Sequence, residues 1–272
     1  MIYLEICVLN TETDVKSKRK RRGKRALIAA GTAFALILIF AIFFKAYVMD
    51  YYHADNVIIN SVKNVFDGKV HTYSSDDGMV FLPACKEYKA VIVFYPGGKV
   101  EYTAYSPFMY ELAGRGYVCI LPRMPENLAF LRIDAIDILD KYIGDNAERV
   151  QGLNWYLAGH SLGGVAAAAY LNDSPEREYE GLILCASYTT QDFSDSDLRL
   201  LSIYGSNDKV LNMESYEKNR ANWPAESEEI IISGGIHSYF GSYGIQKGDG
   251  QPEMSNAEQI KEAADHIADW AY

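Results

Sequence analysis

The sequence has few cysteines, and none of them is arranged for a metal site or a disulfide scaffold. Its 272 residues include four cysteines, Cys7, Cys85, Cys119 and Cys185. No two of them form a Cys-x-x-Cys pair and their spacing does not repeat, which argues against both zinc-binding and disulfide-rich classes. Cys119 and Cys185 fall within apolar runs typical of buried strands, so we interpret them as small hydrophobic core residues.

Positive charge is scarce beyond the first 25 residues. These residues contain eight Lys or Arg, all between Lys16 and Arg25, against three acidic residues, which is a net charge of +5. Because the whole chain carries −10, the remainder carries −15. A chain that is acidic after residue 25 is not expected to bind nucleic acid, since binding phosphates requires Lys and Arg. There is also no internal repeat, and the length favours one catalytic-size domain plus a tail.

Long hydrophobic runs are absent except at residues 26–44, where no charged residue occurs. As a helix this run would be about 28 Å long, close to the thickness of a bilayer's hydrocarbon core. We therefore predict a basic cytoplasmic tail at 1–25, a transmembrane helix at 26–48 and an extracytoplasmic domain at 49–272, because the basic cluster directly precedes the run. A cleaved signal peptide is the alternative, disfavoured by the length of the run and by the lack of a small-x-small cleavage site.

In the body of the chain, short apolar runs alternate with helical patterns. Predicted strands cover 69–73 and 79–83, joined by an Asp-Gly turn, then 90–95, 117–121, 155–158, 181–187, 198–204 and 228–232. Predicted helices cover a run from a Ser106 cap to Gly114, a run over 128–143 capped by Asn127, the Ala-rich run after Ser161, and a C-terminal helix opened by a Ser255–Glu258 capping box. This alternation predicts an α/β fold, with a mostly parallel sheet, helices on both faces and no separate lid domain.

The segment Gly159-His160-Ser161-Leu162-Gly163 lies between an apolar strand and an Ala-rich helix, which is the context of a nucleophile elbow. Side chains in place of the two glycines would collide with the neighbouring strand and helix. Ser161 is therefore the predicted nucleophile. The Leu162 N–H, at a helix N-terminus, is the predicted first donor of an oxyanion hole. We expect the His160 side chain to point away from the serine and to be structural.

A serine nucleophile needs a base and an acid, which are expected at the carboxyl ends of strands. Asp208 follows the strand at 198–204, and His237 follows the strand at 228–232. The order Ser, Asp, His is that expected after a nucleophile elbow. Other acidic residues that could replace Asp208 are Asp192, Asp195, Asp197 and, less favoured, Asp249.

The strand at 90–95 breaks at Pro96-Gly97-Gly98, where a second oxyanion donor is expected. The Gly98 N–H is the first choice and the Lys99 N–H the second, because glycine permits close approach of the backbone to a carbonyl oxygen. A tight turn without a catalytic role is the alternative. Several tyrosines lie near these turns and some of them could line the pocket: Tyr95, Tyr102, Tyr105, Tyr204, Tyr239 and Tyr243.

Four segments together resemble the α/β-hydrolase superfamily: Gly-His-Ser-Leu-Gly-Gly, the turn at 94–100, the segment 202–208 and the segment 234–250. More narrowly, the chain is similar to a bacterial membrane-anchored group of small lidless hydrolases distantly similar to dienelactone hydrolases. The resemblance covers residues 50–272 and implies Ser161 as nucleophile, Asp208 as acid and His237 as base, with no metal or organic cofactor. Dienelactone hydrolases proper use a cysteine nucleophile, so their substrate is not carried over to this chain.

The expected function is therefore hydrolysis of a carboxylic ester through an acyl-enzyme, with a small-molecule or acyl substrate and a single-pass membrane anchor. Amidase, peptidase or thioesterase activity on cell-envelope material is an open alternative. A non-catalytic binding module on the same fold is less favoured, because every expected catalytic residue type is present.

Overall fold

A computed structural model describes residues 2–85, 87–136, 147–173 and 177–271. The chain divides into two compact units, Met1–Asp50 and Tyr51–Tyr272. The first unit contains one helix, α1 (Ile2–Met49). Within it, Leu27–Met49 is long and apolar enough to cross a membrane, and it is the one such segment in the described chain. Its bounds agree with the predicted span at 26–48, whereas the helix itself extends back to Ile2, which the sequence did not predict.

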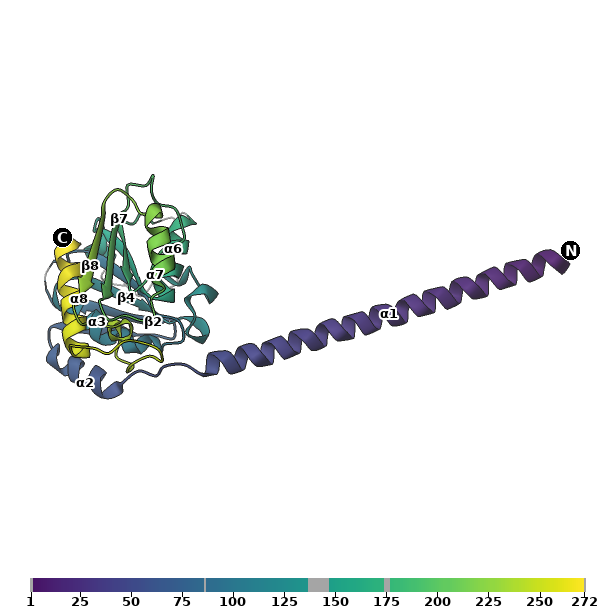
Figure 1. Ribbon diagram of the computed structural model, residues 1–272, viewed down its shortest axis with the longest axis horizontal. Coiled ribbons are helices and arrows are strands. Elements are labelled where there is room, and N and C mark those ends of the chain that lie inside the picture. The colour runs from purple at the N-terminus through teal and green to yellow at the C-terminus, as the bar shows by residue number, and fades with distance from the viewer. Residues whose placement is uncertain (1, 86, 137–146, 174–176, 272) are drawn as a thin grey trace. The chain divides into compact units, whose positions relative to one another are not determined.

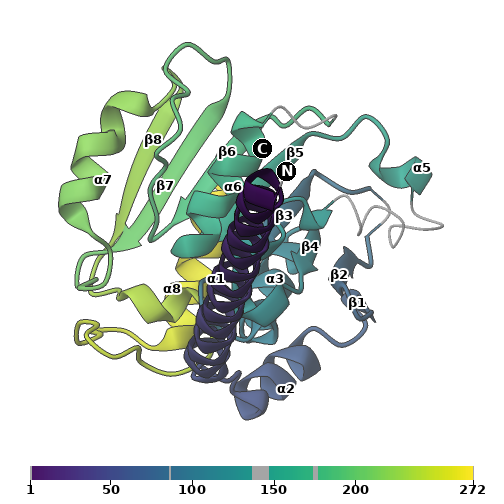
Figure 2. The ribbon, with the colours of Figure 1, turned by 90° about the vertical axis from the view of Figure 1, so that its right-hand side faces the viewer.

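The second unit is built on an eight-stranded sheet with the strand order β1-β2-β4-β3-β5-β6-β7-β8 (Figures 1 and 2). The strands are β1 (Val70–Ser74), β2 (Gly78–Pro83), β3 (Val91–Tyr95), β4 (Val118–Pro122), β5 (Trp155–His160), β6 (Gly181–Cys185), β7 (Arg199–Gly205) and β8 (Ser227–Ile232). β1 and β2 form the predicted hairpin, and β2 pairs antiparallel with β4. The remaining neighbouring pairs, β4–β3, β3–β5, β5–β6, β6–β7 and β7–β8, are all parallel. The carboxyl ends of these six strands therefore share one edge of the sheet.

Helices cover both faces of this sheet, which confirms the predicted fold class. In the described part of the second unit the α-helices are α2 (Asn56–Val65), α3 (Ser106–Gly114), α5 (Ala147–Val150), α6 (Leu162–Asn172), α7 (Met213–Asn219) and α8 (Asn256–Trp270). Figures 1 and 2 show α8 and α6 on opposite sides of the strands. Successive residues of a strand point to opposite faces, and accordingly β3 divides between two apolar cores. Ile92 and Phe94 pack with residues of α3 and α8, whereas Val91 and Val93 pack with residues of α6.

Two predicted helix features differ in the structure. Ser106 is not an N-cap, because a 3₁₀ helix at Tyr102–Tyr105 leads directly into α3 and Ser106 is already its first residue. The predicted helix over 128–143 begins instead as a 3₁₀ turn at Ala129–Leu131, and Asn127 has a positive φ of 56° rather than a capping role. Residues 137–143 of that prediction lie outside the described residues. The capping box at Ser255 and Glu258 is present as predicted.

The connection between β6 and β7 bears on access to the sheet edge. Residues 186–198 form bends and turns, with no helix or strand. This segment is too short to hold a lid domain, and no lid unit is found elsewhere in the described part of residues 51–271. The connection between β6 and β7 therefore adds only a short loop at the carboxyl edge of the sheet.

Candidate active site

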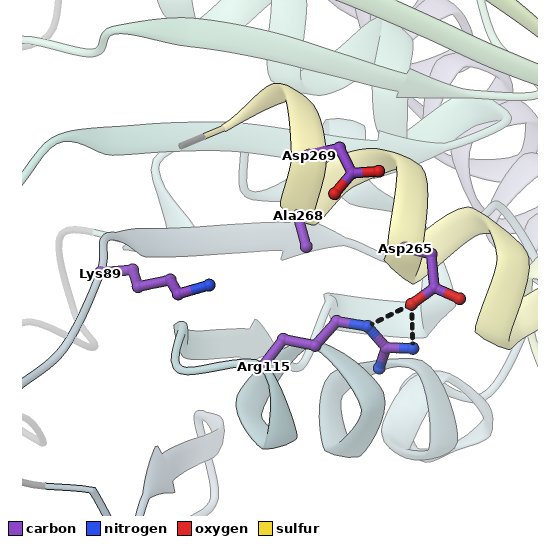
Figure 3. Close-up of a pocket in the computed structure, with 5 residues that line it drawn as sticks. All are labelled: Lys89, Arg115, Asp265, Ala268 and Asp269. Carbon is purple, nitrogen blue, oxygen red and sulfur yellow. Dashed lines mark hydrogen bonds and ion pairs between the residues drawn. The ribbon is translucent and has the colours of Figure 1, made fainter.

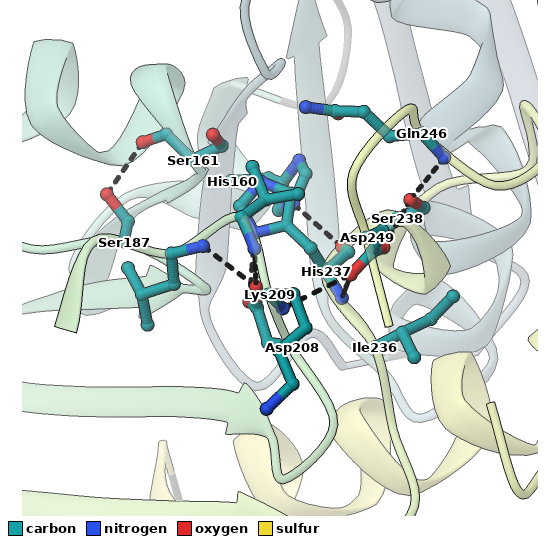
Figure 4. A network of polar contacts seen from close by, with 12 residues as sticks. His160, Ser161, Ser187, Asp208, Lys209, Ile236, His237, Ser238, Gln246 and Asp249 are labelled. Carbon is teal, nitrogen blue, oxygen red and sulfur yellow. Dashed lines mark hydrogen bonds and ion pairs between the residues drawn. The ribbon is translucent and has the colours of Figure 1, made fainter. Parts of the chain in front are cut away.

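Ser161 lies on a sharp turn between the end of β5 and the start of α6. Its backbone has φ 52° and ψ −124°, a combination that side-chain-bearing residues rarely adopt. The Ser161 N–H donates to the Cys185 carbonyl at the end of β6 (3.0 Å), which fixes the turn to the neighbouring strand. The Ser187 hydroxyl, two residues further along, donates to the Ser161 carbonyl (2.6 Å) (Figure 4). The strained turn is thus bonded to the end of β6 through both its N–H and its carbonyl.

The glycines of the elbow are required by close packing. A Cβ atom on Gly163 would lie 2.2 Å from the Tyr95 carbonyl oxygen, and a Cβ on Gly159 would lie 2.5 Å from the Gly163 carbonyl carbon. Distances this short to backbone atoms cannot be relieved by a side-chain rotation. The sequence-based explanation of these two glycines is therefore confirmed.

Asp208 and His237 are in direct contact. The His237 Nδ1 and the Asp208 Oδ2 are 2.9 Å apart, and both side chains are almost completely buried. The other carboxylate oxygen of Asp208 accepts from the N–H groups of Val210 and Leu211, each at 2.8 Å. An ionised carboxylate accepts and cannot donate, so Nδ1 of the neutral imidazole carries the proton and Nε2 has a free lone pair. That Nε2 atom is buried and has no hydrogen-bond partner among the described residues.

Ser161 and His237 line the same pocket, which has a volume of about 180 Å³. No hydrogen bond joins the Ser161 hydroxyl to the His237 Nε2 within the described chain. In structures without substrate such a contact is often long and shortens only in the complex. The pocket is otherwise lined by Leu162, Val165, Ala186, Ser187, Tyr188, Val210, Leu211 and Asn212.

The two residues predicted to supply oxyanion donors are neighbours in space. A Cβ atom on Gly98 would lie 2.6 Å from Cδ2 of Leu162, so the turn after β3 packs directly against the start of α6. Neither the Gly98 N–H nor the Leu162 N–H donates to an acceptor within the described residues. Two unpaired N–H groups next to a nucleophile elbow are what an oxyanion hole requires. The Lys99 N–H, the second choice, instead donates to the Asn127 carbonyl (2.8 Å).

The buried His160 side chain forms two hydrogen bonds whose partners the sequence did not indicate. Its Nε2 lies 3.0 Å from the carbonyl oxygen of His237, and its Nδ1 lies 2.8 Å from the Tyr105 hydroxyl. A carbonyl only accepts, so Nε2 carries the proton and Nδ1 accepts from Tyr105. The Tyr105 hydroxyl accepts in turn from the Gly97 N–H (3.0 Å). His160 and Tyr105 therefore connect the turn that holds Gly98 with the loop that holds His237.

Burial keeps His160 neutral. Its pKa is lowered well below the ordinary value, first by loss of solvation and then by the nearby His237 imidazole, against a smaller opposing effect of its bond to the His237 carbonyl. The two imidazole rings are 4.6 Å apart between centroids. Burial therefore keeps a positive charge off the ring that lies next to His237.

The lowered pKa of His160 predicts that the folded protein loses stability at acidic pH. An unfolded His160 takes up a proton near pH 6.5, whereas the folded one stays neutral, so the free energy of unfolding should fall as the pH drops below that value. The slope from this residue approaches about 1.4 kcal/mol per pH unit. Urea unfolding at pH 7.5 and at pH 5.5 should differ by about 1.4 kcal/mol from this residue in the wild type, and by less in His160→Gln. The exposed His71 offers the control, since His71→Gln should retain the wild-type difference.

Asp249, considered above as a substitute acid, holds the backbone next to His237 instead. Its Oδ1 accepts from the His237 N–H (3.2 Å), and its Oδ2 accepts from the N–H (2.8 Å) and the hydroxyl (2.5 Å) of Ser238 (Figure 4). These bonds fix the main chain at the start of the 3₁₀ helix His237–Phe240. The imidazole of His237 is held by Asp208 alone among the acids considered. Asp192 is exposed and accepts from the Ser194 N–H and hydroxyl.

None of the six tyrosines considered above lines the pocket of Ser161 and His237. Tyr95, Tyr105 and Tyr243 are buried in the apolar cores. The tyrosine that lines the pocket is Tyr188, in the bend after β6. It was not identified because its segment carries no pattern that distinguishes it from other polar loops.

A second, larger hollow of about 490 Å³ lies near the C-terminal helix, away from these residues (Figure 3). It is lined by Lys89, Arg115, Asp265, Ala268 and Asp269. The Arg115 guanidinium is already engaged by Glu111 and Asp265, each at 2.6 Å. Arg115 and Asp265 are thus paired with each other, and the described residues that line this hollow include no serine, cysteine or histidine.

The comparison with known families agrees with this geometry. The model of the alpha/beta hydrolase family matches residues 91–261, which is more than half of the chain and includes Ser161, Asp208 and His237. The chain therefore belongs to the alpha/beta hydrolase family. No curated protein matches it. Membership of this family supports hydrolase chemistry on this fold.

Proposed function

We propose that the protein is a serine hydrolase that cleaves carboxylic esters through an acyl-enzyme. In this mechanism the Ser161 hydroxyl attacks the ester carbonyl carbon while the His237 Nε2 takes its proton. Asp208 stabilises the imidazolium, and the N–H groups of Leu162 and Gly98 bind the oxyanion. The imidazolium then protonates the departing alcohol, and a water molecule, activated by the same His237, releases the acid.

One observation carries this proposal more than any other. The His237 imidazole is buried and is oriented by Asp208 through Nδ1, while its Nε2 has no partner among the described residues, in a pocket that Ser161 also lines. Leaving a buried polar nitrogen unpaired costs free energy, and such a group calls for a functional explanation. Acceptance of a proton from the serine supplies that explanation.

The pocket favours small acyl groups. Its volume of about 180 Å³ lies below the range of about 300–1,000 Å³ common for sites that enclose drug-sized ligands. Leu162, Val165 and Leu211 offer apolar contacts to a short chain, whereas Tyr188 and Asn212 add polar groups. We therefore expect esters of short acids to be hydrolysed with higher kcat/KM than long-chain esters.

Covalent labelling tests the proposal directly. A fluorophosphonate probe should label the full-length protein, and peptide mass spectrometry should find the adduct on Ser161. The Ser187 hydroxyl lines the same pocket and so provides an internal comparison within the same sample. A protein that takes no label and hydrolyses no ester would contradict the proposal and favour a non-catalytic binding module.

A substrate panel distinguishes ester hydrolysis from amidase, peptidase and thioesterase activity. p-Nitrophenyl esters from acetate to palmitate, matched thioesters and peptide anilides should be tested on one preparation. We expect acetate and butyrate esters to be the best substrates. Higher kcat/KM for anilides would identify an amidase or peptidase, and higher kcat/KM for thioesters would identify a thioesterase.

We further propose that Leu27–Met49 anchors the protein with its N-terminus in the cytoplasm and residues 51–272 outside. The basic cluster at Lys16–Arg25 immediately before the apolar segment supports this orientation, since positive residues flank membrane spans on the cytoplasmic side. Protease added to spheroplasts should then digest the catalytic unit. A catalytic unit protected until the membrane is dissolved would contradict the orientation.

A further inference from the structure

The four residues 52–55, here called the strap, lie near the start of the second unit, directly before α2. They bind two loops of that same unit. Tyr52 forms an isolated parallel bridge with Val100. Its N–H donates to the Lys99 carbonyl (2.8 Å), and its carbonyl accepts from the Glu101 N–H (2.9 Å). Because Lys99 directly follows Gly98, the strap is bonded to the residue next to the proposed oxyanion donor.

The strap also binds the loop that follows His237. The Asp55 N–H donates to the Ser242 carbonyl (2.8 Å), and the Tyr52 hydroxyl accepts from the Lys247 N–H (3.0 Å). The Tyr52 ring packs against Tyr243, with 5.6 Å between centroids. Residues 242–247 come soon after the 3₁₀ helix that begins at His237. The strap therefore contacts both segments that carry the proposed catalytic groups.

A further, partly buried contact of the strap involves Glu101. One oxygen of its carboxylate accepts from the Ala54 N–H (3.1 Å), and the other accepts from the Thr103 hydroxyl (2.9 Å). The carboxylate thus bonds the strap on one side and the start of the 3₁₀ helix Tyr102–Tyr105 on the other. That 3₁₀ helix contains Tyr105, whose hydroxyl binds the Gly97 N–H.

The turn at Gly98 depends on such external bonds. It has no regular secondary structure of its own, and Lys99 has a positive φ of 59°, which is unfavourable for a residue with a side chain. An oxyanion donor works only when it is held within a few tenths of an ångström of its position. The Lys99 carbonyl accepts from Tyr52 and the Lys99 N–H donates to Asn127, so the strap supplies one of the main-chain bonds that hold this residue.

We propose that the strap is a positioning element of the active site: it holds the Gly98 turn and the His237 loop in the relative positions that catalysis requires. The segment that follows the apolar helix is then part of the catalytic framework. This inference rests on the proposed function for its effect on catalysis. Its effect on the two loops is independent of that function. The experiment therefore measures both.

The test compares three variants of the full-length protein in detergent micelles. Tyr52→Ala removes the ring and the hydroxyl, and Tyr52→Pro also removes the N–H that donates to Lys99. Tyr51→Pro is the matched control, because the Tyr51 N–H donates to no acceptor within the described chain. Amide hydrogen exchange is followed in peptides covering 97–101 and 238–247, and kcat and KM are measured for p-nitrophenyl acetate.

We expect faster exchange in both peptides for Tyr52→Ala, a larger increase for Tyr52→Pro, and no change for Tyr51→Pro. The kcat of Tyr52→Pro should fall roughly 10- to 100-fold with little change in KM, because displaced donors weaken transition-state binding. Unchanged exchange in the Tyr52 variants would overturn the proposal, and so would faster exchange with wild-type kcat. If the wild type itself neither hydrolyses esters nor takes the fluorophosphonate label, the proposed function fails, and the exchange data alone decide whether the strap orders the two loops.

Discussion

Replacing Ser161 by alanine is expected to lower kcat for ester hydrolysis by about 10⁴- to 10⁶-fold, because the remaining groups have no nucleophile to activate. The fold should survive the change. No hydrogen bond to the Ser161 hydroxyl occurs within the described residues, and alanine is no more strained than serine at φ 52°. Steady-state kinetics with p-nitrophenyl acetate, together with urea unfolding at pH 7.5, would separate loss of chemistry from loss of stability.

The control for this variant is Ser227→Ala. Ser227 is exposed at the start of β8, at the end of the strand opposite to the carboxyl edge, and its replacement should leave kcat unchanged. If Ser161→Ala retains more than about one hundredth of the wild-type kcat, Ser161 is not the nucleophile. Ser187 would then be the first residue to test, since its hydroxyl lines the same pocket.

Features determined by local sequence could be predicted well. Strands β3, β5 and β6 are buried on both faces and contain almost only apolar residues, so their pattern is unambiguous. The elbow is equally local, because Ser161 and its flanking glycines must follow a strand and open a helix. Once the sheet is parallel, its topology brings the carboxyl ends of β7 and β8 to the same edge. The contact between Asp208 and His237 follows from that placement.

Features that depend on distant partners could not be predicted. His160 binds a hydroxyl 55 residues away and a carbonyl 77 residues away, so nothing near it in the sequence indicates its partners. The strap bonds Tyr52 to Lys99 through main-chain groups, which every residue possesses and which leave no sequence pattern. The incorrect N-cap at Ser106 has a different, local origin, because Ser-Pro cannot reveal that a 3₁₀ helix already precedes it. Long-range contacts therefore account for the missed roles of His160 and Tyr52.

Replacing Asp208 by asparagine is expected to lower kcat by about 10⁴-fold while preserving the fold. The reason lies in the two N–H groups of Val210 and Leu211, which donate to the same carboxylate oxygen, Oδ1. In the variant, only the amide oxygen can accept these bonds, so the NH₂ group must face His237. An NH₂ group donates, which forces the His237 Nδ1 to accept and moves the ring proton to Nε2. The nitrogen that should take the proton of Ser161 is then already protonated.

This argument predicts a specific kinetic pattern. The KM of Asp208→Asn should change little, because Asp208 does not line the pocket, and fluorophosphonate labelling should slow in proportion to kcat. The matched control is Asp192→Asn, the same change at an exposed carboxylate that was an alternative acid, and it should leave both rates unchanged. A large loss of kcat in Asp192→Asn with near wild-type kcat in Asp208→Asn would assign the acid to the loop after β6. Asp208 would then serve only to hold the His237 loop, through a hydrogen bond that asparagine could also make.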